Sequence, residues 1–504
     1  MKTSKLYLAI LLMVASCAKD DPKPAPLTIE SFSPSTAAVR SEIQIRGTGF
    51  SATPTGNTVL FNGVKAQVLT SPSSTSLTVT VPVSTSGKIT VQVGSQTATS
   101  TDDFVYMGPS ISNFSPKQGG PGQLITLFTN NYSPIKSENV FKINGVNASF
   151  ATVVGGNPSP DQFFITVPQG SGSGFITIEI GGLKGTSSIP FFYQQPLTVT
   201  TLAGSTQKGY ADGSSARFNA PTGVAVDGSG FVYVADSQNH SIRKISPSGI
   251  TTTLAGDGTK GNKNGNGFSA QFNTPWSLAL DAAGNVFVAD LGNQSIRKIT
   301  PTGDVTTLAG NGAAGFANGN GSAVQFNNPY AIAIDKSSNV YVGERSQIRK
   351  ITPQGDVTTL AGQGTNSLQF GFIGALTIDP DGNLYAAEVY RVLKITPSGI
   401  VSVHPSTVYQ GSSSKLTSFD GIAWGKDGSL FLSDYFEGKI KKIHPSGATG
   451  DYAGSGSSGG EDGTDKTAKF GYPSGLAIDG NGVLYVADGA FGATNNSIRK
   501  ITVN

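Results

Sequence analysis

Short runs of alternating hydrophobic and polar residues dominate residues 27–106. The runs at 43–46, 77–81 and 89–93 place an apolar side chain at every second position, with Gly, Pro and Ser residues between them. A period of two is typical of strands with one buried face, and the turn spacing predicts a small β-sandwich. Residues 107–193 repeat the pattern and predict a second sandwich.

Three motifs recur in the same order in both segments. They are Ile-x-x-Phe-Ser-Pro at 29–34 and 111–116, an Asn-Gly turn at 62–63 and 144–145, and a strand ending in Val-Pro at 81–82 and 167–168. This order resembles the IPT/TIG family of immunoglobulin-like modules, which commonly act as spacers. The resemblance implies two immunoglobulin-like domains, over 27–106 and 107–193, with a junction at 194–196.

The rest of the chain repeats itself. Phe-Asn-x-Pro occurs at 218–221, 272–275 and 326–329, and each copy leads into an apolar strand that ends at Asp227, Asp281 or Asp335. Shorter copies place inner strands near 375–379, 421–424 and 475–479. Each unit offers four strands, such as those near 223–227, 232–236, 241–245 and 250–255 in the first copy, which predicts six blades of a β-propeller.

The motifs Val-Ala-Asp, Asn-x-x-Ile-Arg-Lys-Ile and Thr-Thr-Leu-Ala-Gly resemble NHL repeats and extend over 197–504. The last unit stops at its third strand, 498–501, whereas an unassigned strand precedes the first unit. We expect strand 198–203 to pair with the last blade, which closes the ring and removes two exposed strand edges. The predicted fold is therefore all-β, with two immunoglobulin-like β-sandwiches followed by a six-bladed β-propeller.

Composition narrows the class of protein. Of 504 residues, 65 are glycine and only 13% are charged, which suits strands joined by tight turns. The formal net charge is +3 without basic blocks, so no nucleic-acid partner is predicted. Cys17 is the single cysteine, which excludes an internal disulfide.

The N-terminus carries a secretion pattern. Lys2 and Lys5 precede an apolar run at 6–14, and Ala15-Ser16 stands directly before Cys17. This pattern predicts a cleavable signal peptide over 1–16. Val-Ala-Ser-Cys resembles the bacterial lipobox, which implies that Cys17 is acylated and anchors the mature chain to a membrane.

Residues 17–26 then form a tether spaced by prolines. Its sequence at 18–21, Ala-Lys-Asp-Asp, resembles the signal that sends lipoproteins to the outer surface of polysaccharide-degrading Gram-negative bacteria. The alternative is a solvated tether without a sorting role. The expected location is the outer membrane, with the lipid-anchored protein facing the cell exterior.

Acids and bases recur in register in the repeats. The second strands end in an acid in all six units, and five third strands carry a base at the matching position, whereas the fourth unit has Leu393 there. We interpret these residues as strand-to-strand ion pairs of the scaffold, with Arg391 as a substitute base for Glu388. The Gly-rich loops at 209–213, 261–267, 315–321 and 460–463 have no metal or phosphate spacing and are interpreted as connections.

The connections that enter the inner strands are expected to reach one mouth of the central channel. In chain order their residues are Thr222, Trp276, Tyr330, Gly374, Asp420 and Ser474. The loops between second and third strands should add Tyr390, Tyr435, Phe436 and Phe491 on the same face. Aromatic faces stack on sugars or apolar groups, so the aromatic residues and Asp420 are the candidate ligand-binding residues. The alternative is that Trp276 and Tyr330 pack between blades.

Candidate catalytic chemistry is sparse. The three histidines fall in different strand contexts without metal-ligand spacing, and no activated nucleophile is visible. No catalytic residue, metal site or cofactor is therefore predicted. The leading hypothesis is a non-catalytic, surface-anchored protein that captures extracellular polysaccharide through the propeller face. A metal-assisted lyase or lactonase that uses Asp420, as in similar six-bladed enzymes, and a propeller that binds a protein ligand are the alternatives.

Overall fold

The protein is described by a computed structural model that covers residues 25–504 except 152–161, 363–367, 369, 389–390, 406–418, 490–491 and 494. Every regular element in these residues is a β-strand or a three-residue 3-10 helix, which confirms the all-β class. No helix in this part of the chain is long and apolar enough to cross a bilayer. The predicted signal peptide, Cys17 and residues 18–24 lie outside the described residues.

The chain divides into two compact units. The first contains residues 27–106, the second contains 197–504, and residues 107–193 are distributed between them.

Residues 27–106 form two sheets, with strand orders β1-β3-β7-β6 and β2-β9-β8-β4-β5. Alternate side chains of β3 are buried, as the period of two predicts, and Ile45 and Leu77 are fully buried cross-strand partners. The ring of Phe104 makes edge-to-face contacts with Phe61 and Tyr106, both at 5.1 Å. The elements are β1 (Thr28–Ser33), β2 (Thr36–Ala37), β3 (Glu42–Thr48), η1 (Pro54–Gly56), β4 (Thr58–Phe61), β5 (Val64–Lys65), β6 (Gln67–Ser73), β7 (Ser76–Thr80), β8 (Gly87–Val93) and β9 (Gln96–Tyr106).

Residues 107–193 form three sheets, with strand orders β10-β12-β15, β11-β18 and β14-β13-β16-β17. The Asn-Gly turn predicted at 144–145 joins β13 to β14, and both of its residues have positive φ. The elements are β10 (Ser110–Ser115), β11 (Gln118–Gly119), β12 (Leu124–Asn130), η2 (Lys136–Glu138), β13 (Val140–Ile143), β14 (Val146–Asn147), β15 (Gln162–Thr166), β16 (Ile176–Ile180), β17 (Leu183–Thr186) and β18 (Phe192–Tyr193).

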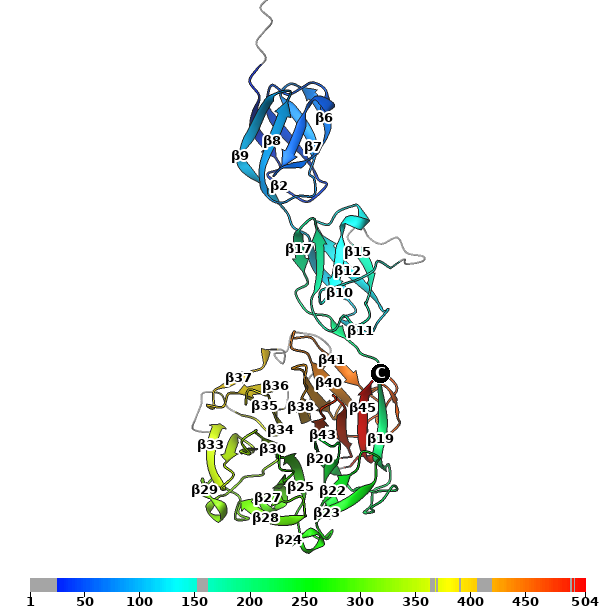
Figure 1. The fold of residues 1–504 in the computed structure, drawn as a ribbon, viewed down its shortest axis with the longest axis vertical. Helices are drawn as coiled ribbons and strands as arrows, with labels where there is room; N and C mark the ends of the chain where they lie inside the picture. Colours follow the sequence, from blue (N-terminus) through cyan, green and yellow to red (C-terminus); the bar gives the residue numbers. More distant parts are fainter. Residues whose placement is uncertain are drawn as a thin grey trace, which may run out of the picture. The chain divides into compact units, whose positions relative to one another are not determined.

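Residues 197–504 form six sheets, numbered here 1 to 6 in chain order, each built of four main strands. The first strand of each sheet contacts the first strand of the next, and β43 contacts β20, so these inner strands form a closed, propeller-like ring (Figure 1). Four successive main strands build each of sheets 1 to 5, whereas sheet 6 takes its fourth from β19.

The bounds of the ring elements follow the repeats. Sheet 1 has β20 (Pro221–Val226), β21 (Val232–Asp236), η3 (Ser237–Asn239), β22 (Ser241–Ile245) and β23 (Thr251–Ala255). Sheet 2 has β24 (Gly265–Asn266), η4 (Gly267–Ser269), β25 (Pro275–Leu280), β26 (Val286–Asp290), η5 (Leu291–Asn293), β27 (Ser295–Ile299) and β28 (Asp304–Ala309). Sheet 3 has β29 (Gly319–Asn320), η6 (Gly321–Ala323), β30 (Ala331–Ile334), β31 (Val340–Gly343), β32 (Gln347–Ile351) and β33 (Asp356–Gly362).

The later sheets repeat the same arrangement of four main strands. Sheet 4 has β34 (Ile373–Ile378), β35 (Leu384–Glu388), β36 (Arg391–Ile395) and β37 (Val401–Val403). Sheet 5 has β38 (Phe419–Trp424), β39 (Leu430–Asp434), β40 (Lys439–Ile443) and β41 (Thr449–Ala453). Sheet 6 has β19 (Leu197–Ser205), β42 (Gly463–Thr464), β43 (Pro473–Ile478), β44 (Leu484–Asp488) and β45 (Asn496–Val503).

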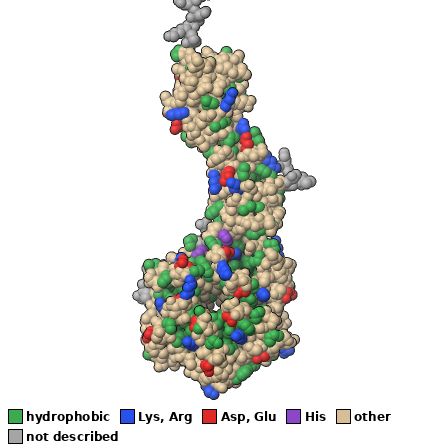
Figure 2. All heavy atoms as spheres, viewed as in Figure 1, with side chains coloured by type: hydrophobic (Ala, Val, Ile, Leu, Met, Phe, Trp, Pro, Cys, Tyr) green, Lys and Arg blue, Asp and Glu red, His purple; other side chains and the backbone are tan. Residues whose placement is uncertain are grey.

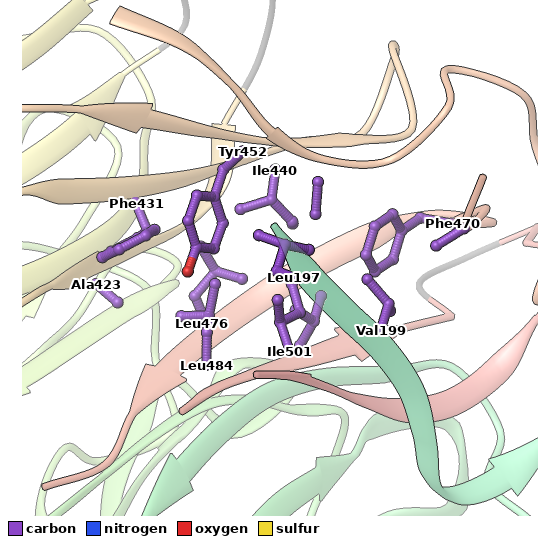
Figure 3. Packing of buried hydrophobic residues seen from close by; sticks show 13 residues of the cluster. Leu197, Val199, Ala423, Phe431, Ile440, Tyr452, Phe470, Leu476, Leu484 and Ile501 are labelled. Carbon is purple, nitrogen blue, oxygen red and sulfur yellow. The ribbon is translucent and has the colours of Figure 1, made fainter. Parts of the chain in front are cut away.

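The strand expected to close the ring is present. β19 pairs antiparallel with β45 over its whole length, with Val199 opposite Ile501 and Ala203 opposite Ile498. Leu197 and Val199 are fully buried beside Phe470 (Figure 3). Backbone pairing and apolar burial therefore join the start of the ring to its end.

The tight turns between first and second strands follow from the aspartates that end the inner strands. The Asp227 carboxylate accepts hydrogen bonds from the backbone N–H groups of Ser229 and Phe231, at 2.9 and 3.0 Å. Gly230 has φ +83°, which L side chains rarely adopt. The same aspartate pattern recurs at Asp281 and Asp335, as predicted for hairpin turns.

A candidate ligand-binding site at the mouth of the ring

The inner strands of all six sheets line a central cavity of about 280 Å³. Figure 2 shows a hollow near the centre of the ring. We use "mouth" for the end of this cavity where the inner strands begin, because both Trp276 and Asp420 line it there. Deeper in the cavity each strand contributes an apolar side chain, and these are Val224, Leu278, Ile332, Leu376, Ile422 and Leu476.

Three aromatic rings from successive sheets meet at one side of the mouth. Trp276 of sheet 2 makes an edge-to-face contact with Tyr330 of sheet 3, with ring centroids 5.6 Å apart. Tyr330 makes a second such contact, at 4.7 Å, with Phe372 beside sheet 4. All three side chains are half-buried. The rings of Trp276 and Tyr330 therefore pack on each other, and each side chain keeps part of its surface exposed.

A carboxylate and two tyrosines occupy the mouth at sheets 5 and 6. The rings of Tyr435 and Tyr472 are stacked, with centroids 4.5 Å apart and planes 13° apart. The Tyr472 hydroxyl is hydrogen-bonded to the Asp420 carboxylate. Burial raises the pKa of Asp420 to about 6, although the Tyr472 hydrogen bond partly lowers it. Burial and the neighbouring carboxylate also raise the pKa of Tyr472, which keeps its hydroxyl protonated.

The raised pKa of Asp420 predicts a pH-dependent cost to folding. Below about pH 4 both folded and unfolded chains hold the proton, and above pH 6 both have released it. Between these values the unfolded chain binds fewer protons, so stability falls as pH rises. We expect Asp420→Asn to remove this loss. Relative to wild type, the free energy of unfolding of the variant should therefore be higher at pH 8 than at pH 4, by up to roughly 2 kcal/mol. Denaturant titrations at both pH values measure the gain, and an identical difference at the two pH values contradicts it.

Three of the predicted site residues remain to be placed, namely Phe436, Tyr390 and Phe491. Phe436 follows Tyr435, contacts its ring at 4.2 Å and is 70% exposed. It lies at the mouth end of sheet 5, because Asp434 at the end of β39 pairs with Phe419 at the start of β38. Tyr390 and Phe491 lie outside the described residues.

Small residues hold the inner strands together where aromatic residues are missing. The buried Thr222 hydroxyl donates to the carbonyl of Trp276 at 2.6 Å, and the buried Ser474 hydroxyl donates to the carbonyl of Thr222 at 3.0 Å. A Cβ at Gly475 would lie 2.5 Å from the Thr222 carbonyl oxygen, so only glycine permits this close approach. The inner strands of sheets 6 and 1 are therefore in close contact, and the trio of Trp276, Tyr330 and Phe372 lies at sheets 2 to 4.

Phe372 and Tyr472 escaped the sequence analysis, although the sequence holds a signal for them. In three repeats the motif Phe-Asn-x-Pro has Ala220, Thr274 or Asn328 at its third position, each with positive φ. In the fourth and sixth repeats Gly replaces the Asn, and the third position becomes Phe372 or Tyr472. These repeats have a small residue, Gly374 or Ser474, two positions later, where the second and third repeats carry Trp276 and Tyr330 and the first carries Thr222.

The buried ion pairs belong to the scaffold, as predicted. Distances between the paired atoms are 2.7 Å for Asp236–Arg243, 3.0 Å for Asp290–Arg297, 3.3 Å for Glu344–Arg349 and 3.2 Å for Asp488–Arg499, and each side chain is fully buried. Arg391 pairs with Glu388, which confirms it as the substitute base in the fourth unit. Sheet 5 differs from the expected pairing, because Lys441 lies 3.9 Å from Asp434 and closer to Glu437 and Asp451.

These acids also fix the loops that lead to the mouth. One oxygen of Asp488 accepts hydrogen bonds from the backbone N–H groups of Gly471 and Tyr472, both at 2.8 Å, while the other faces Arg499. Asp290 accepts from the backbone of Asn273 in the same way. The ion pairs thereby position the segments that carry Tyr472 and Trp276.

The Gly-rich loops have a structural role that their sequence did not reveal. Each of four buried arginines donates to a side-chain oxygen in the adjacent loop, and the acceptors are Asp212, Asn264, Asn318 and Asp462. The loops therefore cover the arginines from outside. Acceptor and arginine are 31 to 37 residues apart in the chain, so only the folded sheet brings them together.

The histidines take part in local hydrogen bonds. His240 accepts from the backbone N–H of Thr274 at 3.1 Å, and His444 contacts the hydroxyl of Ser446 at 2.9 Å. Within the described part of the chain, no three His, Cys, Asp or Glu side chains gather as a possible metal site. These residues therefore provide no observation in favour of the metal-assisted lyase or lactonase.

Comparisons with known proteins identify parts of the chain. Residues 27–106 match the model of the IPT/TIG domain, and residues 218–245 and 272–299 match the NHL repeat. A curated relative, Protein SUPPRESSOR OF QUENCHING 1, chloroplastic, from Arabidopsis thaliana, is 32% identical over 323 residues, or 61% of this chain. The chain spans about a quarter of that relative's length, 27%.

Two solved structures from Bacteroides thetaiotaomicron are similar in shape over 79% of this chain and 98% of their own. One is a structural genomics protein of unknown function, with a TM-score of 0.49 and 20% identity. The other is an auxiliary nutrient binding protein, with a TM-score of 0.46 and 17% identity. On the family matches, the protein contains an IPT/TIG domain and NHL repeats.

Proposed function

We propose that this protein is a non-catalytic binding protein that captures extracellular polysaccharide at the mouth of the ring. The observation that carries the proposal is the half-buried trio of Trp276, Tyr330 and Phe372 beside a cavity that Asp420 also lines. Aromatic rings offer apolar faces to the C–H surfaces of sugars, while a carboxylate accepts hydrogen bonds from their hydroxyl groups.

The dimensions of the cavity favour the end of a chain over its middle. Ligand pockets usually enclose roughly 300–1,000 Å³, and this cavity of about 280 Å³ lies just below that range. One terminal sugar unit would enter the cavity, and the following units would lie across the aromatic rings. The stacked Tyr435 and Tyr472 supply hydroxyl groups on the opposite side.

The proposed function includes the presentation of this site outside the cell. In this proposal Cys17 carries the lipid anchor in the outer membrane, residues 27–106 and 107–193 act as two immunoglobulin-like spacers, and residues 197–504 form a six-bladed β-propeller. Support comes from the lipobox-like sequence at 14–17, from the IPT/TIG match and from the ring of six sheets. Metabolic labelling with a radioactive fatty acid tests the anchor, and Cys17→Ser should abolish the label.

Removal of the aromatic pair tests the proposed site. We expect Trp276→Ala combined with Tyr330→Ala to weaken polysaccharide binding about 5- to 100-fold, since each aromatic contact contributes roughly 0.5–1.5 kcal/mol. A glycan array finds the ligand, and calorimetry with the full chain measures the affinity. Phe268→Ala is the matched control, because Phe268 is 63% exposed and lies in η4, away from the cavity lining. Unchanged binding in the double variant contradicts the site.

A protein ligand is a second candidate, favoured by Phe436. A ring with 70% of its surface exposed beside Tyr435 is typical of a residue buried on association with another protein. In this case Phe436→Ser should abolish binding of a protein partner and leave glycan binding unchanged. Loss of glycan binding in that variant contradicts a separate protein-binding role.

A further inference from the structure

Asp420 differs from the acids of the scaffold because its charge has no basic partner among the described residues. The second-strand acids face Arg or Lys side chains, whereas Asp420 is hydrogen-bonded to the neutral hydroxyl of Tyr472. Its carboxylate is mostly buried at the cavity wall, where water screens charge poorly. A ligand that brings a positive charge into the cavity therefore gains more from Asp420 than a neutral ligand does.

The aromatic side of the mouth favours the same kind of ligand. Trp276 lines the cavity together with Asp420, and Tyr330 and Phe372 continue its aromatic surface. Aromatic faces attract ammonium groups through their negative π-surface, and a tryptophan does so best. The mouth therefore offers a carboxylate and aromatic faces around one small cavity.

We propose that the site selects saccharides that carry a free, protonated amino group, as in polymers of glucosamine. This inference rests on the proposed function and names its ligand class. The ammonium group pairs with Asp420, while the apolar face of the sugar lies on the aromatic rings. N-acetylation removes the positive charge and leaves the sugar ring intact, and a uronic acid places a second negative charge beside Asp420.

The charge of the whole protein does not explain such a preference. Its formal net charge of +3 includes Lys2 and Lys5 of the predicted signal peptide, so the mature chain is close to neutral and does not attract cationic ligands as a whole. Preference for an amino sugar would therefore be a property of the local site. Selectivity that persists at physiological salt would agree with a buried contact, since salt screens exposed charges more strongly.

Calorimetry with the full chain and three matched β-1,4-linked tetrasaccharides tests the inference, with glucosamine, N-acetylglucosamine and glucose as the respective units. We expect the free-amine tetrasaccharide to bind about 10- to 100-fold more tightly than the other two, as a hydrogen bond to a charged group implies. Asp420→Asn should reduce its affinity to that of the glucose tetrasaccharide. Asp381→Asn is the matched control, because Asp381 is exposed and lies in the turn at the far end of β34.

The outcomes separate the inference from the proposed function. Equal affinities for the three tetrasaccharides, with binding lost in the Trp276→Ala and Tyr330→Ala variant, overturn the amino-group preference and keep the saccharide site. A free-amine preference that survives Asp420→Asn also overturns the inference. Absence of binding to any of the three sugars and to the glycan array overturns both. A circular dichroism melt of each variant confirms that it is folded.

Discussion

Replacing Val199 with aspartate should lower the free energy of unfolding of the ring by more than about 4 kcal/mol, the largest effect that we expect. Val199 is fully buried among Leu197, Phe470 and Ile501, in the contact that joins β19 to β45 (Figure 3). A carboxylate there has no partner, and its desolvation opposes the pairing that closes the ring. Denaturant unfolding of the full chain, followed by tryptophan fluorescence, measures the change.

Thr200→Asp is the control for this experiment. Thr200 is the next residue of β19, pairs with Lys500 and is exposed, so an acid there should change stability by less than about 0.5 kcal/mol. If both variants unfold at the same denaturant concentration, burial of β19 in the ring is contradicted. Loss of saccharide binding should accompany Val199→Asp, since an open ring no longer holds sheets 5 and 6 in place beside sheet 1.

Replacing Arg297 with methionine should destabilise the ring by about 3–5 kcal/mol. The guanidinium group donates to Asp290, to the backbone carbonyls of Gln271 and Lys263, and to the Asn264 side chain. Methionine fills much of the volume, but it leaves the Asp290 carboxylate buried without a countercharge. Thermal and denaturant unfolding should both report the loss.

Two further variants test whether the loss of stability in Arg297→Met comes from the unpaired Asp290 carboxylate. Asp290→Asn added to Arg297→Met removes the uncompensated charge, so the double variant should be more stable than Arg297→Met alone. Lys469→Met breaks a pair with Glu461 whose side chains are 36% and 59% exposed, and should cost less than about 1 kcal/mol. A loss in Arg297→Met no larger than in Lys469→Met would contradict the structural role of the buried pair.

The repeat pattern predicted the backbone of the ring well. Strands near 232–236 and 241–245 appear as β21 and β22, and the strand ahead of the first repeat appears as β19. Such predictions work because the repeated motifs mark equivalent strands in each unit, and because the aspartates that end the inner strands form their turns locally. The repeats also predicted that Trp276 and Tyr330 lie close together, because they hold equivalent positions in neighbouring sheets.

Other parts of the site could not be predicted from equivalent positions in the repeats, because they depend on contacts made by loop residues. Phe372 reaches Tyr330 from a loop position rather than from a strand, and Tyr472 stacks on Tyr435 from the neighbouring sheet. The acceptors in the Gly-rich loops were missed for a similar reason, because a buried arginine selects them in three dimensions. The features that all six repeats share therefore predict the scaffold, whereas the residues that differ between repeats form the mouth.

The origin of β19 has a consequence for how the molecule is made. The Thr198 hydroxyl donates a hydrogen bond to the Asn504 side chain, 306 positions later in the chain. The first strand of the ring, β19, therefore cannot pair with β45 until residues 496–503 have been synthesised. Throughout synthesis, two sheet edges stay open to other chains. Contacts between such distant residues form slowly, and the growing polypeptide is most exposed to misassembly until its final strand arrives.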